Sequence, residues 1–387
     1  MPKPVIGIVG GGIGGLTAAI ALRKLGTDAI VFEQAGKYGR VGADINLTPN
    51  AVRALDGLGV GDALRSSAAR PTFRISRMWD SGEETSRIAM DMVAEEKYGS
   101  PQLTLHRADL IDALEEALPD AVVRLGTKVT AIEAGADGVV IDTEEAGRIH
   151  VGALVGADGI HSLVRKALFG EDQPIFTGIV AYRAVVASEA LAGVPDRGAF
   201  TKWWGPDPQT QIVTFPLSRG EETFIFATTG QDSWSEESWT APGDVAELRD
   251  RYADFHPDAR ALLDACSDVL KSALNIHEPL PHWSEGRVTL LGDACHAMLP
   301  FMAQGASQAI EDAVVLARAL AANDDIPAAL ATYESSRRER TTSIQVGSRT
   351  NEWLKVGGDA DWVYGYDAWS APLGVPSGTP PVDSLPR

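Results

Sequence analysis

Residues 5–33 read VIGIVGGGIGGLTAAIALRKLGTDAIVFE, and this stretch decides the fold. Val5–Val9 is a short β-branched run typical of a buried parallel strand, and Gly14–Leu25 follows with the apolar spacing of a helix. Ala29–Glu33 then has the composition of a second strand. The stretch therefore predicts a β-α-β unit, the building block of a parallel sheet.

The glycines between the first strand and the helix match the dinucleotide fingerprint G-x-G-x-x-G at Gly10, Gly12 and Gly15. In this fingerprint the first glycine allows a tight turn, the second lets a pyrophosphate approach the backbone, and the third lets helix and strand pack closely. Ile13 and Gly14 open the helix, whose N-terminus is expected to face the phosphates.

The second strand ends in an acid. Glu33 lies 18 residues after Gly15, where a carboxylate can accept hydrogen bonds from an adenosine ribose and disfavours a 2′-phosphate by charge repulsion. We expect Glu33 and the following Gln34 to bind the adenosine end of a dinucleotide. The alternative is a glycine-rich turn that binds nothing, which the flanking strands, helix and acid disfavour.

Length and composition limit the other possibilities. The chain has 387 residues, 44% hydrophobic and 22% charged, which suits two or three domains or one large fold with an inserted sheet. Its formal net charge of −19 argues against a nucleic-acid partner and favours a small substrate. Two cysteines, Cys266 and Cys295, cannot form a disulfide framework or a zinc cluster, so we expect no metal site and a cytoplasmic protein with reduced thiols. No apolar run reaches the ~18–20 residues of a membrane span, so no membrane partner is expected.

Further along the chain the pattern changes twice. Residues 177–231 alternate β-rich runs with Pro, Gly and Asp turns, which predicts an antiparallel sheet. Val288–Gly292 returns to the buried-strand pattern, and helices are expected over Gly305–Ala322 and about Ala328–Lys355. We therefore expect an α/β fold in which a Rossmann-like domain carries an inserted antiparallel sheet and ends in C-terminal helices.

Four more motifs follow the glycine fingerprint in order. They are Arg40-Val41-Gly42-Ala43; His106-Arg107-Ala108-Asp109-Leu110; Gly156-Ala157-Asp158-Gly159 with Ser162 and Arg165; and Leu291–His296 followed by Gly305-Ala306. Together the five motifs resemble the FAD-dependent aromatic hydroxylases, the group A flavoprotein monooxygenases, over nearly the whole chain. Lys202-Trp203-Trp204, Phe255-His256-Pro257, Met302–Ala306 and Asp361–Asp367 add a resemblance to the subgroup that hydroxylates salicylate and 6-hydroxynicotinate.

This resemblance implies a glutathione-reductase type of FAD-binding domain in three pieces, residues 1–70, 101–176 and 276–325. The inserted substrate domain would comprise residues 71–100 and 177–275, and the C-terminal helix and tail residues 326–387. It also implies tightly bound FAD, NADH or NADPH as a transient reductant, and O2. Reduced flavin would form a C4a-hydroperoxide that hydroxylates an electron-rich ring, with loss of a ring substituent left open, in a monomer or homodimer.

The resemblance assigns residues to the cofactor. Asp293 would bind the ribityl hydroxyls, and Gly305 and Ala306 would direct backbone amides at the isoalloxazine. The remaining residues of the expected cofactor set are Arg40, Ala43, Arg107, Val129 and Asp158. Arg40 and Arg107 would reach the phosphate and ribityl region, and Asp158 would link the cofactor loop to nicotinamide use.

The substrate pocket is expected between the flavin and the inserted sheet. The candidate catalytic residues are Asn46, Tyr182, Gln211, His296 and Pro300. The candidate substrate-binding residues are Arg183, Lys202, Gln209, Val213, Phe215 and Phe301. Strand alternation predicts that Gln209, Gln211 and Val213 all face the pocket or all face away from it.

Several positions differ from the 6-hydroxynicotinate hydroxylases. Those enzymes carry His, His, Tyr and His where this chain has Asn46, Gln209, Val213 and Phe301, so most of the obvious proton-transfer groups are missing. A structural role for His296 is favoured over catalysis. Asp44, where a glycine is usual, is either a local acid or an ordinary loop residue.

Two other functions are compatible with an FAD-binding fold. Flavin-dependent halogenases share the cofactor fold but typically carry a Trp-x-Trp-x-Ile-Pro string, which none of the nine tryptophans forms. An FAD-bound sensor or interaction protein is the non-enzymatic alternative.

Overall fold

The computed structural model describes residues 4–39, 44–236 and 240–374. Its first sheet is built on the β-α-β unit, with β1 (Ile6–Val9) and β2 (Ala29–Phe32) parallel on either side of α1 (Ile13–Lys24) in sequence. The other strands are β7 (Val123–Arg124), β11 (Ala153–Gly156), β17 (Ser284–Glu285) and β18 (Val288–Leu290), in the order β17-β18-β11-β1-β2-β7. All pairs are parallel except β17 with β18, which confirms the predicted Rossmann-like sheet.

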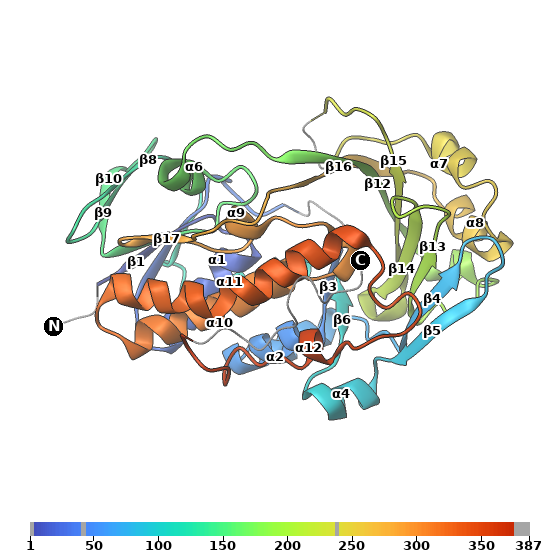
Figure 1. Cartoon of the computed structure of the whole chain (residues 1–387), viewed down its shortest axis with the longest axis horizontal. Coiled ribbons are helices and arrows are strands. Elements are labelled where there is room, and N and C mark those ends of the chain that lie inside the picture. Colours follow the sequence, from blue (N-terminus) through green and yellow to red (C-terminus); the bar gives the residue numbers. More distant parts are fainter. Residues whose placement is uncertain (1–3, 40–43, 237–239, 375–387) are drawn as a thin grey trace.

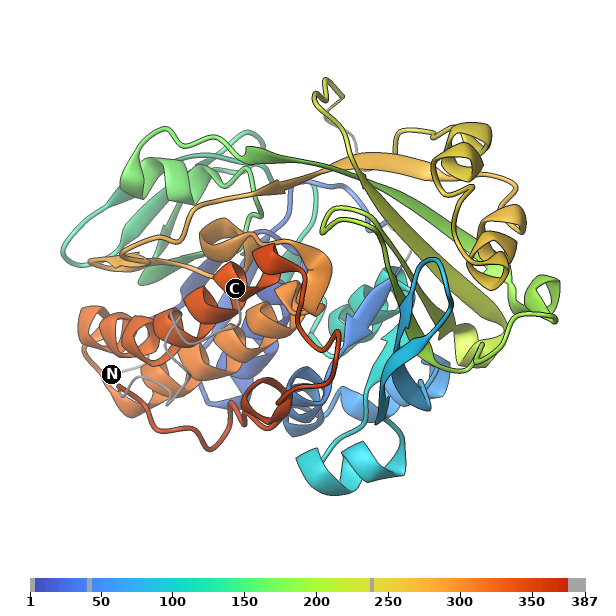
Figure 2. The ribbon, with the colours of Figure 1, turned by 45° about the vertical axis from the view of Figure 1, so that its right-hand side comes forward.

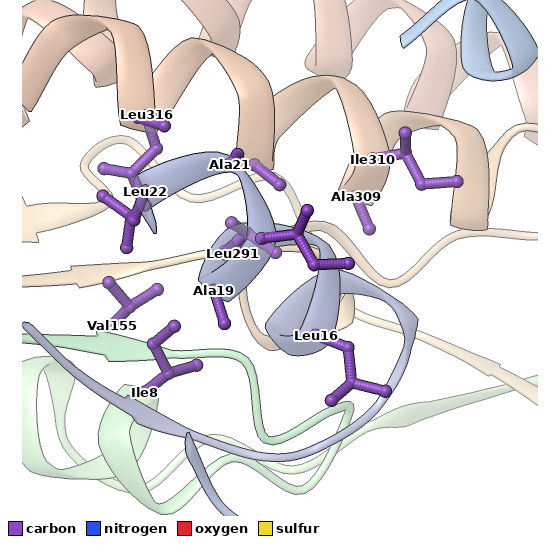
Figure 3. Packing of buried hydrophobic residues seen from close by; sticks show 14 of the residues in the cluster. Ile8, Leu16, Ala19, Ala21, Leu22, Val155, Leu291, Ala309, Ile310 and Leu316 are labelled. Carbon is purple, nitrogen blue, oxygen red and sulfur yellow. The ribbon is translucent and has the colours of Figure 1, made fainter. Parts of the chain in front are cut away.

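Small side chains let helices pack closely over this sheet. Helix α10 (Gly305–Ala322) lies against α1, and Figure 3 shows Leu22 of α1 next to Leu316 of α10, while Ala19 of α1 is directed toward Ile8 and Val155. All of these residues, including Ile8 and Val155 of the sheet, are buried in one core cluster. This packing fixes the N-terminus of α10, which the cofactor site uses.

The second sheet has seven strands in the order β16-β12-β15-β14-β13-β4-β5. Their bounds are Leu270–Ile276 (β16), Ile175–Ala187 (β12), Glu222–Gly230 (β15), Gln211–Leu217 (β14), Phe200–Trp204 (β13), Phe73–Met78 (β4) and Glu84–Ala89 (β5). Neighbours are antiparallel, as predicted, except that β4 runs parallel to β13. The two sheets lie on opposite sides of the molecule (Figure 1). The domain boundaries given above stay a prediction.

Each face of the seven-stranded sheet has a different cover. Helices α7 (Val245–Arg251) and α8 (Pro257–Asp264) lie on the outer face (Figure 2). On that face Tyr182, Trp203 and Ile212 belong to a buried cluster that also includes residues of both helices. The inner face is turned toward the first sheet. Alternation therefore assigns every second residue of these strands to the space between the sheets.

Smaller elements complete the fold. A three-stranded sheet holds β8 (Val129–Ala134), β9 (Val139–Thr143) and β10 (Gly147–Val151), and β3 (Ile45–Leu47) pairs with β6 (Leu103–Leu105). The remaining helices are α2 (Pro49–Leu58), α3 (Gly61–Ser67), α4 (Met92–Tyr98), α5 (Arg107–Glu116), α6 (Leu163–Phe169), α9 (Asp293–His296) and α12 (Asp361–Tyr364). Within the described ranges, no helix is both long and apolar enough to cross a membrane.

The last long helix is shorter than predicted. Helix α11 runs from Ile326 to Thr350, whereas the sequence pattern extends it to Lys355. Asn351 adopts the left-handed conformation, with φ 51° and ψ 35°, and ends the helix there. The same residue reaches the seven-stranded sheet with its side chain, as described below.

Candidate active site

A cavity of about 860 Å³ lies between the two sheets and is lined by both. The first sheet contributes the loops that follow its strands, and the second contributes inward-facing side chains. The carboxyl ends of parallel strands are the usual binding edge of such a sheet. The cavity is therefore a composite of a cofactor half and a substrate half.

The glycine loop lies at the cofactor end. Gly10 has φ +102°, and a Cβ there would lie 2.3 Å from the carbonyl oxygen of Ala157. A Cβ on Gly15 would lie 1.9 Å from the carbonyl oxygen of Gly10, so neither position accepts a side chain. A Cβ on Gly12 would meet no atom of the described residues within 4 Å, which leaves the backbone open to a ligand. Gly10, Gly12, Ile13 and Gly14 line the cavity, whereas Gly15 packs beneath it.

The acid at the end of β2 is held in place. Glu33 accepts hydrogen bonds from the backbone amides of Gly11 through Oε2 and of Ala35 through Oε1, both at 2.7 Å. Its carboxylate lines the cavity together with Gln34 and Val129. Each oxygen keeps a lone pair for a further donor, which fits the two hydroxyls of a ribose.

The end of the cavity at which the flavin ring is expected is built from two helix starts. Asp293 begins α9 directly after β18, and its side chain is exposed toward the cavity. Gly305 and Ala306 begin α10 and also line the cavity, so their amides face it. A helix N-terminus stabilises negative charge, which suits a reduced flavin ring.

Other expected cofactor residues divide into three groups. Arg107 lines the cavity at the start of α5. Asp158 also lines it, but its oxygens accept bonds from the Ser162 hydroxyl and the Val164 amide, so it also fixes the start of α6. Arg40 and Ala43 lie outside the described residues. The open backbone at Gly12, the Glu33 carboxylate and the α10 N-terminus together fit the shape and charge of FAD.

The substrate half is organised by the register of the seven-stranded sheet. Arg183 pairs with Phe226, Phe226 with Val213, and Val213 with Lys202, across β12, β15, β14 and β13. All four side chains line the cavity, and we call them the cation row. The row places two basic residues at its ends and two apolar residues between them.

Aromatic residues and polar groups flank the cation row. Phe224, Phe215 and Phe200 form the adjacent row, with Phe215 and Phe200 stacked at 5.5 Å between ring centroids. Gln211 lies on the other side, and Pro300 and Phe301 close the cavity from the segment after α9. These rings make the substrate half largely apolar.

Lys202 is almost fully buried, with 2% of its surface exposed. Its Nζ donates to Asn351 Oδ1 and lies 3.7 Å from the centroid of the Trp204 ring and 5.5 Å from that of Phe301. Burial lowers the pKa of the Lys202 ammonium well below its usual value, and the charges of Arg74 and Lys355 lower it further.

Arg183 occupies the other end of the row. Its Nη1 donates to Ser272 Oγ at 2.5 Å, and its guanidinium lies 5.7 Å from the Phe226 centroid. Burial lowers the pKa of Arg183, while the nearby Asp44 raises it. Burial raises the pKa of the Asp44 carboxyl to about 6, and Arg183 and Arg107 oppose that rise. Asp44 lines the cavity between the two halves.

Two buried side-chain amides each have one atom without a hydrogen-bond partner among the described residues. Asn46 accepts a bond from Gln102 through Oδ1 at 2.8 Å, but its Nδ2 has no hydrogen-bond partner among the described residues. Gln211 Oε1 is likewise unpaired within the described part of the chain. Both residues line the cavity, and leaving buried polar atoms unpaired is costly, so they suit a polar ligand.

Two expected pocket residues on the seven-stranded sheet or next to it lie elsewhere. Tyr182 faces the outer cluster under α7 and α8, because it is adjacent to Arg183 on one strand. Gln209 does not line the cavity, since it lies in the turn before β14 and packs near Gly230. The prediction that Gln209, Gln211 and Val213 share one face was therefore wrong.

His296 is buried behind the cavity rather than in it. Its Nε2 lies 2.6 Å from Asp312 Oδ2, and its ring contacts Trp283. It belongs to a buried charge network in which Arg337 donates to Asp312 at 2.8 Å and Arg340 to Glu311 at 2.9 Å. A catalytic assignment for His296 does not fit this position, whereas a structural role does.

The sequence interpretation also missed cavity residues. Phe200, Phe224 and Phe226 line the substrate half, and the alternation of Phe224 and Phe226 on β15 could have revealed the latter two. Asn351, which contacts Lys202 from 149 positions away, carries no local signal.

Comparison with known proteins identifies a matching family and several relatives of this chain. A model of the FAD-binding domain family matches residues 3–346. The chain is 36% identical to 6-hydroxynicotinate 3-monooxygenase of Pseudomonas fluorescens, over 97% of this chain and 98% of that protein. It is also 36% identical to a 3-amino-4-hydroxybenzoate 2-monooxygenase of Streptomyces platensis, over 96% of this chain and 98% of that one.

Solved structures with a similar fold include two complexes. A salicylate hydroxylase substrate complex superposes with a TM-score of 0.82 at 28% identity, over 95% of this chain and 96% of that one. Klebsiella pneumoniae HpxO with FAD and uric acid gives 0.80 at 29% identity, over 92% and 89%.

Proposed function

Since this chain belongs to the FAD-dependent aromatic monooxygenases, we propose that it hydroxylates a small, electron-rich aromatic acid whose ring lies across the cation row. The proposed substrates are hydroxybenzoates, hydroxypyridine carboxylates and related phenols, with NADH as the reductant. The observation that carries the proposal is the row itself, which pairs two basic ends with an apolar middle.

The dimensions of the row suit one ring. Arg183 and Lys202 lie three strand steps apart, which is about 14 Å between Cα atoms at the usual strand spacing. Two long side chains shorten that gap, so a single ring with oxygen substituents at opposite positions can lie between their heads. Val213 and Phe226 would then contact the faces and edges of the ring.

The residues around the row would stabilise the cofactor, exclude water and hydrogen-bond the ring. FAD, once reduced by NAD(P)H, supplies the activation of O2. Gly305 and Ala306 would stabilise negative charge on its ring with the N-terminus of α10. The phenylalanines would exclude water from the reacting atoms, and Asn46 Nδ2 and Gln211 Oε1 would hydrogen-bond ring substituents.

The test is a substrate panel. Purified FAD-loaded protein is given NADH or NADPH with 3- and 4-hydroxybenzoate, salicylate, 6-hydroxynicotinate or aminophenols, and products are identified by mass spectrometry. The product mass also separates addition of an oxygen atom from exchange of a carboxylate for a hydroxyl. Failure of every ring to be oxygenated, with flavin present and reducible, would refute the proposal.

The variant Arg183→Gln tests whether this end of the cation row binds the substrate carboxylate. We expect it to raise the KM of a carboxylated substrate by about 10- to 100-fold, because a buried charge-assisted hydrogen bond is lost, while FAD stays bound. Loss of FAD in this variant would place Arg183 in the cofactor half instead.

A further inference from the structure

We propose that Lys202 accepts the proton of the substrate's ring hydroxyl, and that Asn351 is the residue that positions it for this step. The proposal rests on the proposed function, because it needs a hydroxylated ring in the cavity. It supplies the proton acceptor that the sequence does not identify.

The surroundings of Lys202 fit a proton acceptor better than a fixed cation. Among the residues that the structure describes, no carboxylate forms an ion pair with Lys202, although it is 2% exposed. The Trp204 ring, 3.7 Å away, offsets only part of the cost of burying an ammonium that has no carboxylate partner, whereas a neutral amine can be buried. The amine needs only one acceptor, and Asn351 Oδ1 provides it.

Asn351 is oriented for this contact. Its Nδ2 donates to the backbone oxygen of Pro208 at 2.7 Å, so its amide oxygen must face Lys202. Its left-handed backbone, at φ 51°, is one that asparagine tolerates better than most residues. With one N–H directed to Asn351, the amine keeps its lone pair for a ligand in the cavity.

The cations nearby favour a neutral Lys202 before the ligand binds. Arg74 on β4 and Lys355 after α11 both face Lys202 and disfavour its ammonium form. Lys355 Nζ lies 5.5 Å from the centroid of the Trp204 ring, which Lys202 also contacts. Arg183 and Asp44 lie near each other toward the other end of the row. The same cations stabilise a phenolate, and a phenolate bound beside the amine supplies the counter-charge that an ammonium at Lys202 lacks, so the proton transfer ends in an ion pair.

The step balances without another reagent. The O–H bond of the hydroxyl breaks, its electron pair stays on the phenolate oxygen, and an N–H bond forms on Lys202. The result is a phenolate paired with an ammonium. An ionised ring is more electron-rich, which is what oxygen transfer requires, and a positioned base of this kind contributes about 10²–10⁴-fold in rate.

The experiment measures ionisation and proton release without turnover. FAD-loaded protein at pH 7 binds 3- or 4-hydroxybenzoate labelled with ¹³C at the carbon that carries the hydroxyl, and the shift of that carbon reports phenol or phenolate. Calorimetry in two buffers of different ionisation enthalpy counts the protons released per bound ligand. The carboxyl group is ionised before and after binding, so it does not contribute.

We expect the wild-type protein to bind the phenolate with no net proton release. Lys202→Arg, which is always charged, should bind the phenolate and release one proton, and Lys202→Met should bind the phenol. Release of one proton by the wild-type protein, or a bound ligand that stays a phenol, overturns the proposal.

Asn351→Asp tests the positioning residue. A carboxylate beside Lys202 should keep it an ammonium, so one proton is released on binding and kcat at pH 7 falls about 100-fold, recovering at higher pH. Asn323→Asp, an exposed change just after α10, is the control and should alter neither value. An Asn351→Asp protein with the wild-type proton count and pH profile would also overturn the proposal.

The two proposals fail in different ways. If the wild-type protein oxygenates the panel but releases a proton on binding, only the role of Lys202 is refuted. A protein that binds none of these phenols refutes both.

Discussion

Asp44 is a partly buried carboxyl group at the border between the two halves of the cavity. Burial raises its pKa to about 6 in the folded protein, against 3.8 for an ordinary aspartate. A raised carboxyl pKa means that folding stability is highest when the group is protonated and falls as pH rises through about 6. The folded protein is thus destabilised by this one charge at neutral pH.

Replacing Asp44 with asparagine should therefore stabilise the protein in a pH-dependent way. We expect a gain in the free energy of unfolding of about 3 kcal/mol at pH 8 and about half of that at pH 5. Denaturant titration of the FAD-loaded protein at both pH values measures it, with the exposed Asp120→Asn as control. A gain that is equal at both pH values would contradict a raised pKa.

Asp293 is the residue on which cofactor retention should depend most directly. Asp293→Ala removes a carboxylate at the start of α9 that faces the cavity, so FAD affinity should fall about 10- to 100-fold. Fluorescence titration with FAD measures the change, and Asp254→Ala, at an exposed loop position, serves as control. Unchanged affinity would remove Asp293 from the ribityl site.

Helices α10 and α11 are joined by charges rather than by apolar contacts alone. Glu311, Asp312 and Arg337 are 0% exposed, and Asn50 of α2 adds a bond to Glu311 at 2.6 Å. Because α10 also supplies the amides of Gly305 and Ala306, this network fixes from behind the end of the cavity at which the flavin ring is expected. Breaking a buried pair leaves an uncompensated charge, which is more destabilising than the pair is stabilising.

We predict that Arg337→Met lowers the free energy of unfolding by about 3–5 kcal/mol. Arg338→Met is the matched control one residue away. Arg338 is partly exposed and contacts Glu334 at 3.6 Å, so its loss should cost less than about 1 kcal/mol. Equal effects of the two changes in thermal or denaturant unfolding would refute the importance of the network.

Elements were easier to predict from the sequence than the contacts between them. The strands of the β-α-β unit and the strand at Gln211–Phe215 follow from local patterns of apolar residues. The error at Gln209 arose because the strand begins only at Gln211, and a turn breaks the alternation. The network at Arg337 and the contact of Asn351 with Lys202 join positions far apart in sequence, so only the folded chain shows them.

At the scale of the whole molecule, the charge of −19 opposes the arrival of anionic ligands, while the cavity itself holds the basic residues Arg107 and Arg183. The net charge acts over distances that salt screens, since the Debye length falls from about 30 Å at 0.01 M to about 8 Å at 0.15 M. The basic residues inside act at short range and are screened much less. The two effects can therefore be separated by ionic strength.

Association of 4-hydroxybenzoate should accordingly speed up about 3-fold between 0.01 and 0.15 M salt. Stopped-flow quenching of flavin fluorescence gives the rate, and uncharged 4-hydroxybenzamide should show almost no dependence. A rate that falls with added salt would mean that the basic cavity residues dominate at long range.

The cation row belongs to a different sheet from the glycine loop, and its members alternate with residues that hold the outer cluster together. Side chains in the row can therefore be exchanged without altering either the cofactor loop or the packing under α7 and α8. Such an arrangement lets a lineage change its substrate by a few substitutions while it inherits the flavin chemistry intact. For protein engineering, Val213 and Phe226 are thus the first positions to randomise when a new ring is to be accepted.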